Sequence, residues 1–182
     1  MGKNRHVALL RGINVGGNNI IKMVSLRAAF ERMGFTEVQT FIQSGNVVFS
    51  SRLASKAKLT QTIENALSEA FGYASPVVVV SAREIELVVA QAPSGFGKAP
   101  DRYRYDVVFV KEPLTAGEVL EQVPLKPGVD AAHAGEHALY LSKLIGKAAQ
   151  SRLSQLAQRP VYKSITIRNW NTTTRLLELV SG

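Results

Sequence analysis

Apolar residues in the first half of the chain recur with the periods of both strands and helices. The apolar run from His6 to Leu10 predicts a strand buried on both faces, and steps of three and four residues from Met23 to Met33 predict an amphipathic helix. The other elements expected here are hairpin strands over Val38–Ile42 and Val47–Phe49, a helix over Leu59–Ala70 and a strand over Pro76–Val80. This β-α-β-β-α-β order is typical of a ferredoxin-like unit.

The second half repeats this order after an expected helix over Ala82–Gln91 and a linker over Pro93–Pro100. The expected elements are a strand over Arg104–Val110, a helix over Thr115–Gln122, hairpin strands over Val129–His133 and His137–Leu141, a helix over Ala148–Ala157, a strand over Val161–Ile167 and a closing helix over Thr172–Val180. We therefore predict an α+β protein of two tandem ferredoxin-like units, each with an extra helix and a mainly antiparallel sheet. The expected domains are residues 1–92 and 101–182.

This topology predicts two polar edges, one in each unit. The first and second strands of a ferredoxin-like unit point the same way, so the loop after strand one and the hairpin turn share an edge. The glycine-rich loop from Arg11 to Gly17 should therefore lie near Ser44 and Asn46. By the same argument, residues 142–147 should share an edge with residues 168–171. We expect the two edges to form one basic neighbourhood between the halves.

Charge favours an anionic partner. The 182 residues include 22 Lys and Arg against 14 Asp and Glu, a net charge of +8, and residues 140–182 contain seven basic residues and one acid. A basic excess of this kind suits nucleic acid or a phosphate-bearing small molecule, although a protein with solvated charges has the same composition.

Composition also excludes several classes of site. The chain has no cysteine, which excludes disulfides and thiolate sites and favours the reducing cytoplasm. No apolar run approaches the length of a membrane helix, so no membrane partner is expected. His133 and His137 flank a hairpin turn without an evident third ligand, so we predict neither a metal site nor a cofactor.

The glycine-rich loop is a candidate anion site. Its backbone N–H groups can cradle an anion, and Arg11 can add a bidentate contact, but the spacing matches neither the Rossmann nor the Walker phosphate motif. The alternative is that the glycines permit positive φ and that Arg11 and Asn14 hydrogen-bond within the protein. Ser44 and Asn46 equally suit a plain turn, and residues 168–171 equally suit a helix cap. The candidate ligand-binding residues are Arg11, Asn14, Gly16, Gly17, Ser44, Asn46, Lys143, Lys147, Arg168, Asn169, Trp170 and Asn171.

Aromatic residues offer a second kind of nucleic-acid contact. RNA-recognition modules with this topology stack bases on aromatic residues of strands one and three. The corresponding strands of the first unit lack such a face, and the second unit has Tyr103, Tyr105 and Tyr140 in suitable strands, which is too little to predict an RNA-recognition module.

Three segments resemble the signature segments of a bacterial family. They are LLRGINVGG at residues 9–17, QSGNVVF at residues 43–49 and TIRNWNT at residues 166–172. The chain is similar over essentially its whole length to the family catalogued as domain of unknown function 1697. The resemblance implies two ferredoxin-like halves and no agreed activity. We therefore expect a protein that binds a phosphate-bearing ligand, with a small enzyme acting on an anionic metabolite, or purely structural motifs, as alternatives.

Overall fold

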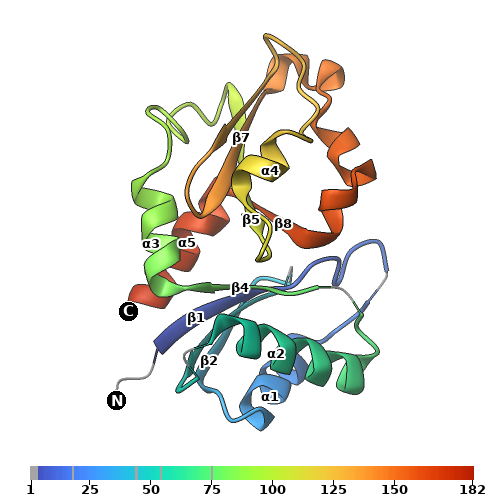
Figure 1. Ribbon diagram of the computed structural model, residues 1–182, viewed down its shortest axis with the longest axis vertical. Helices are drawn as coiled ribbons and strands as arrows, with labels where there is room; N and C mark the ends of the chain where they lie inside the picture. Colours follow the sequence, from blue (N-terminus) through green and yellow to red (C-terminus); the bar gives the residue numbers. More distant parts are fainter. Residues whose placement is uncertain (1–3, 18, 44, 54, 75) are drawn as a thin grey trace. The chain divides into compact units, whose positions relative to one another are not determined.

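The computed structural model describes residues 4–17, 19–43, 45–53, 55–74 and 76–182 (Figure 1). Contacts divide the chain into two compact units, one formed by the chain up to Ile85 together with Leu176–Gly182, the other by Glu86–Arg175. Each unit contains a four-stranded antiparallel sheet and helices, which confirms the α+β class. The expected domain bounds, 1–92 and 101–182, stay a prediction.

The first unit contains the strands and helices expected from its periodicity. They are β1 (Asn4–Leu9), α1 (Met23–Arg32), β2 (Thr36–Phe41), β3 (Asn46–Ser51), α2 (Lys56–Phe71), β4 (Val78–Ser81) and the start of α3 (Ala82–Ala90). The sheet order is β2-β3-β1-β4, and every neighbouring pair is antiparallel. Figure 1 shows α1 and α2 side by side on one face of this sheet.

Successive side chains of β1 project from opposite faces of the first sheet, and both faces are buried. Ala8 pairs with Val47 and Val79 and belongs to the core that the sheet forms with α1 and α2. Val7, on the opposite face, is also fully buried. Each large apolar side chain removed from water in this way contributes roughly 1.5–3 kcal/mol. The continuous apolar run therefore marks a central strand.

The second unit has the same strand order with different connections. Its elements are β5 (Tyr103–Val110), α4 (Ala116–Leu120), β6 (Asp130–Ala134), β7 (Ala138–Leu144), the 3₁₀ segments η1 (Ile145–Gln150), η2 (Leu153–Gln158) and η3 (Pro160–Ser164), β8 (Ile165–Asn169) and α5 (Trp170–Ser181). The sheet order is β6-β7-β5-β8. Val108 and Leu141 lie on the face that packs against α4 and the 3₁₀ segments.

The helix expected over Ala148–Ala157 is wrong, because η1 and η2 occupy that stretch. The Asp130 carboxylate accepts hydrogen bonds from the Ser151 hydroxyl at 2.6 Å and the Arg152 N–H at 2.8 Å. The backbone of Ser151 is extended, with φ −61° and ψ 141°, which interrupts any helix there. The last strand consequently begins at Ile165 and not at Val161.

None of the helices within the described ranges combines the length and apolar character needed to cross a bilayer.

Candidate functional site

The loop after β1 lies against the turn between β2 and β3, as the topology predicts. The Leu10 N–H donates to the Gly45 carbonyl at 2.8 Å. The Asn14 amide donates to the carbonyls of Ile21 and Gln43, both at 3.0 Å, and its oxygen accepts from the Ile21 N–H at 2.9 Å. Both N–H donors of Asn14 are therefore engaged in holding the loop to the turn. Asn14 therefore hydrogen-bonds within the protein, which was the expected alternative to anion binding for this residue.

The loop follows a left-handed path that suits its glycines and asparagines. Asn14 has φ 53°, and Gly16 and Gly17 have φ 60° and 79°. A side chain at Gly16 or Gly17 would meet nothing within 4 Å. Glycine is needed at these two positions for backbone conformation, since space alone would admit a larger residue.

Gly45 in the facing turn is required for both conformation and space. Its φ is 82°, and an added Cβ would lie 2.7 Å from the Leu10 Cβ. Its neighbour Asn46 is fully buried and donates to the Phe41 carbonyl at 3.1 Å. Ser44, the remaining candidate in this turn, lies outside the described residues.

Tyr73 anchors the start of the glycine-rich loop, a role that the sequence pattern did not indicate. Its hydroxyl accepts a hydrogen bond from the Arg11 N–H at 2.8 Å and donates to the Arg11 carbonyl at 2.6 Å. Tyr73 is only 2% exposed. In the sequence, Tyr73 stands out only because it follows Gly72, the left-handed C-cap of α2. That position predicts apolar packing against the helix and does not predict a hydrogen bond from the hydroxyl.

A charged cluster at the other end of the first sheet joins α2 to α3. The Lys56 ammonium and the Glu84 carboxylate are 2.5 Å apart, and Glu84 also accepts from the Ser81 N–H and hydroxyl, both at 2.8 Å. Burial raises the pKa of Glu84, but these hydrogen bonds outweigh it, so the pKa lies below its ordinary value. Burial lowers the pKa of nearby His6, whose ring stacks on Phe49 at 5.6 Å.

At the polar edge of the second unit, the expected residues lie on different faces of the sheet. Lys143 on β7 pairs with Arg104, whereas Arg168 on β8 pairs with Val107. Residues 104 and 107 of β5 are three positions apart, so Lys143 and Arg168 project from opposite faces. Lys143 lies near Asp130, where its charge helps to lower the pKa of that carboxyl.

Arg168 has a local structural role. Its guanidinium donates to the Thr166 hydroxyl at 2.8 Å and to the Ile167 carbonyl at 3.0 Å, and the residue is 8% exposed. Lys147, in contrast, is exposed within η1. The expectation that Arg11 and Arg168 share one basic neighbourhood stays a prediction, because it concerns the placement of the two units.

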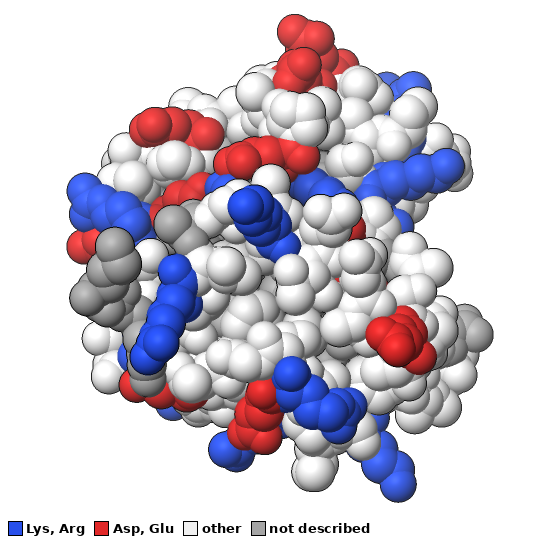
Figure 2. Space-filling model, turned by 60° about the horizontal axis from the view of Figure 1, so that its bottom comes forward, with Lys and Arg blue, Asp and Glu red and all other residues white. Residues whose placement is uncertain are grey.

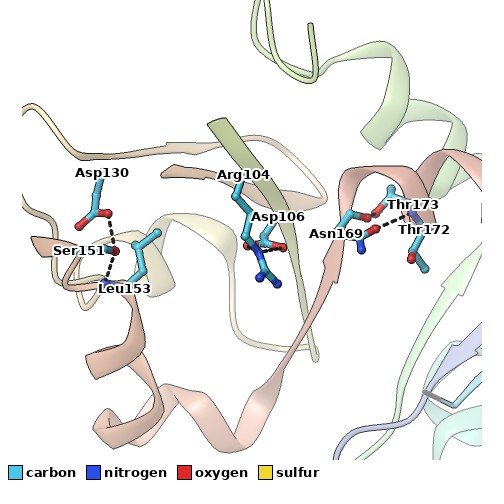
Figure 3. Close-up of polar contacts among 8 residues, drawn as sticks. All are labelled: Arg104, Asp106, Asp130, Ser151, Leu153, Asn169, Thr172 and Thr173. Carbon is cyan, nitrogen blue, oxygen red and sulfur yellow. Dashed lines mark hydrogen bonds and ion pairs between the residues drawn. The ribbon is translucent and has the colours of Figure 1, made fainter. Parts of the chain in front are cut away.

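The start of α5 is organised by Asn169 (Figure 3). The Asn169 side-chain oxygen accepts from the Thr172 N–H at 2.7 Å, and its carbonyl accepts from the Thr173 hydroxyl at 3.0 Å. This cap explains why α5 begins at Trp170, two residues before the expected start. On β5, the Arg104 Nε and an Asp106 carboxylate oxygen are 3.0 Å apart.

Two hollows adjoin this edge within the second unit. One, of about 390 Å³, is lined by Gly97, Pro100, Tyr103, Arg104, Tyr105, Ile145, Asn169, Trp170 and Asn171. The other, of about 460 Å³, is lined by residues 93–96 together with Tyr103, Tyr105, Ala131, Ala132, His133, Tyr140 and Ser142. Both hollows have Tyr103 and Tyr105 in their walls. Asn169, Trp170 and Asn171 therefore line one hollow together, and Lys143 and Arg168 line neither.

Charge is dispersed on one face of the molecule. Figure 2 shows basic and acidic side chains interspersed on the face in view, with broad uncharged areas between them. That face therefore presents no large basic patch. Across the described part of the chain, no three His, Asp or Glu residues form a group that could hold a metal ion.

Comparison with known proteins finds a similar solved structure and a matching family model. No curated protein matches the chain. Among solved structures, the chain is similar to the conserved bacterial protein SP0830 from Streptococcus pneumoniae, with 27% sequence identity and a TM-score of 0.86. That likeness covers 98% of this chain and 99% of the other.

A family model matches residues 3–140 of the chain. Two of the three segments that carry the resemblance, residues 9–17 and 43–49, lie inside this range, and the third, residues 166–172, lies outside it. Because the matched range covers more than half of the chain, this protein belongs to the family described as protein of unknown function DUF1697.

Proposed function

We propose that this protein binds a phosphate-bearing or other anionic ligand at the edge of the second unit where β8 passes into α5. The observation that carries the proposal is the hollow of about 390 Å³ into which Arg104, Asn169 and Asn171 bring polar groups around the start of a helix. The dipole of α5 favours negative charge at this position, next to the Asn169 side chain that accepts from the Thr172 N–H of the first turn.

Arginine chemistry supports the same ligand class. The Arg104 side chain is 60% exposed, and its contact with Asp106 uses Nε, which is one of five N–H donors on a guanidinium. The terminal nitrogens of a guanidinium suit bidentate contact with phosphate. The sequence from His137 to Leu177 contains seven basic residues and no acid, so the surrounding segment adds long-range attraction for an anion.

The proposal is tested by fluorescence anisotropy with labelled short DNA and RNA strands, using labelled nucleotides as smaller probes. We expect binding that weakens with added salt, as phosphate contacts require. Arg104→Ala should weaken the binding of these strands about fivefold or more. It should also lower the slope of log affinity against log salt concentration by about the amount of one phosphate contact.

Arg27→Ala is the matched control, because Arg27 is 59% exposed and likewise paired with a carboxylate, that of Glu31. Absence of binding at low salt, or equal losses in the two variants, would contradict the proposal. The same titration with Arg11→Ala tests whether binding of the ligand also depends on the glycine-rich loop. The titration with Arg168→Ala tests whether it depends on the buried arginine.

We also infer that both units are ferredoxin-like. The support is that each sheet places its first and third strands in the centre, in the orders β2-β3-β1-β4 and β6-β7-β5-β8. The second unit departs from the pattern in having 3₁₀ segments where a second helix is expected. A crystal structure in which β5–β8 superpose on β1–β4, with α4 in the position of α1, tests this inference.

A further inference from the structure

Aromatic side chains gather on one face of the second sheet. Tyr103 and Tyr105 are two residues apart on β5 and therefore project from the same face, with ring centroids 6.0 Å apart. Tyr140 on β7 pairs with Val107, and Ser142 pairs with Tyr105, so both belong to this face as well. Together with Phe96, these side chains line the hollow of about 460 Å³.

Part of this aromatic group is structural. Tyr140 is 2% exposed, and its hydroxyl donates to the Val88 carbonyl at 2.7 Å. Phe96 packs edge-on against Tyr105 at 4.8 Å, Tyr140 at 5.4 Å and Trp170 at 5.1 Å. These contacts hold residues 93–97 against the sheet and form the inner wall of the hollow.

Tyr103 lies at the outer end of the row and is half-buried. Its neighbours are Tyr105 and Arg102, whose guanidinium carbon lies 5.8 Å from the Tyr103 ring centroid. His133, on the edge strand β6 beyond β7, is exposed and also lines this hollow. The hollow therefore combines aromatic walls with polar groups at its rim, a pattern typical of sites for flat heterocycles.

We infer that this hollow binds a base of single-stranded nucleic acid, stacked against Tyr103 and Tyr105. The inference rests on the proposed function, since the adjoining hollow at the start of α5 then receives a phosphate of the same strand. Tyr103 and Tyr105 line both hollows, so a base and a neighbouring phosphate would lie on either side of one tyrosine pair. Arg102 and Arg104 flank Tyr103 in the sequence and supply charge next to the strand.

Arg102 and the two hollows together favour a strand over a free nucleotide or a duplex. A mononucleotide could place its base and its phosphate in the two hollows, whereas a strand also brings a further phosphate to Arg102, which lies beside Tyr103 outside both linings. A duplex keeps its bases stacked inside the helix, where the tyrosine rings do not reach them. Stacking on aromatic side chains is the common means by which proteins hold unpaired bases, and it tolerates most sequences.

The test compares fluorescein-labelled decathymidylate with an abasic strand of the same length and phosphate content, using the full-length protein. We expect decathymidylate to bind about tenfold more tightly than the abasic strand, because each stacked base adds affinity. Tyr103→Leu should remove most of that difference, because leucine has no ring on which a base can stack. Tyr103→Phe should keep it, because the ring is preserved.

Tyr162→Leu is the control, because Tyr162 is a half-buried tyrosine packed against the core on the other face of the sheet. Circular dichroism melting curves establish that each variant is folded. Equal affinity for the two strands, or unchanged binding by Tyr103→Leu, would overturn the base site and leave the proposed anion site standing. Failure of both strands to bind overturns both proposals. Competition by thymidine monophosphate as effective as that by decathymidylate overturns the assignment to a strand.

Discussion

Replacing Tyr73 by phenylalanine removes one oxygen that hydrogen-bonds two partly buried backbone groups of Arg11. The hydroxyl accepts from the Arg11 N–H at 2.8 Å and donates to the Arg11 carbonyl at 2.6 Å, and the ring is 2% exposed. The aromatic packing survives this substitution, so the loss is confined to hydrogen bonding. A buried polar group left unsatisfied costs about 1–3 kcal/mol. Because the two Arg11 groups are only partly buried, we expect about 1–2 kcal/mol for each and a total loss of about 2–4 kcal/mol in the free energy of unfolding.

Urea titration followed by circular dichroism measures this loss. Tyr140→Phe is the matched comparison, because Tyr140 is also 2% exposed but its hydroxyl donates to a single carbonyl, that of Val88. We expect that variant to lose about half as much, roughly 1–2 kcal/mol. A loss for Tyr73→Phe below about 0.5 kcal/mol would refute the reasoning, since water would then satisfy the Arg11 backbone equally well.

Three further predictions concern the loop, the charged cluster and the segment before β5. Asn14→Ala should cost about 2–3 kcal/mol in urea titration, because it removes three hydrogen bonds at φ 53°, whereas Asn14→Gly should cost less because glycine relieves the backbone strain. Because the pKa of Glu84 is lower in the folded state, its contribution is present above the unfolded pKa and is lost as pH falls through the folded one. Glu84→Gln should therefore flatten the acid limb of a stability profile as the pH falls below the ordinary glutamate pKa of about 4.3, and an unchanged slope would contradict this. Gly97→Ala should destabilise the second unit by about 2–4 kcal/mol, since its Cβ would lie 2.3 Å from the Trp170 Nε1 at φ +79°. Gly95→Ala shares that φ but meets nothing within 4 Å, so tryptophan fluorescence in urea should show a loss of only about 1 kcal/mol.

Periodicity located most of the secondary structure because burial requires it. The apolar run from His6 to Leu10 is a central strand because both of its faces are removed from water, and α1 follows the steps of three and four residues that begin at Met23. These features depend on local spacing. The expected meeting of the glycine-rich loop with the hairpin turn also followed, because sheet topology fixes which loops share an edge.

Contacts between residues distant in sequence decided the rest. The stretch from Ala148 to Ala157 has helical spacing, yet Asp130, about twenty residues earlier, binds the hydroxyl of Ser151 and the N–H of Arg152 and turns the chain. Lys143 and Arg168 are both basic residues at one edge, but strand register places them on opposite faces of the sheet.

The sequence by itself determined the family, the α+β class and the positions of the central strands, because each depends on residue types at short, regular spacing. Only the tertiary structure decided that Asn14 holds a loop, that Tyr73 bridges the backbone of Arg11 and that Tyr103 and Tyr105 line two adjoining hollows. The direction of a side chain and its partners depend on the register and packing of segments far apart in the chain. That information is not contained in any local pattern of apolar and polar residues.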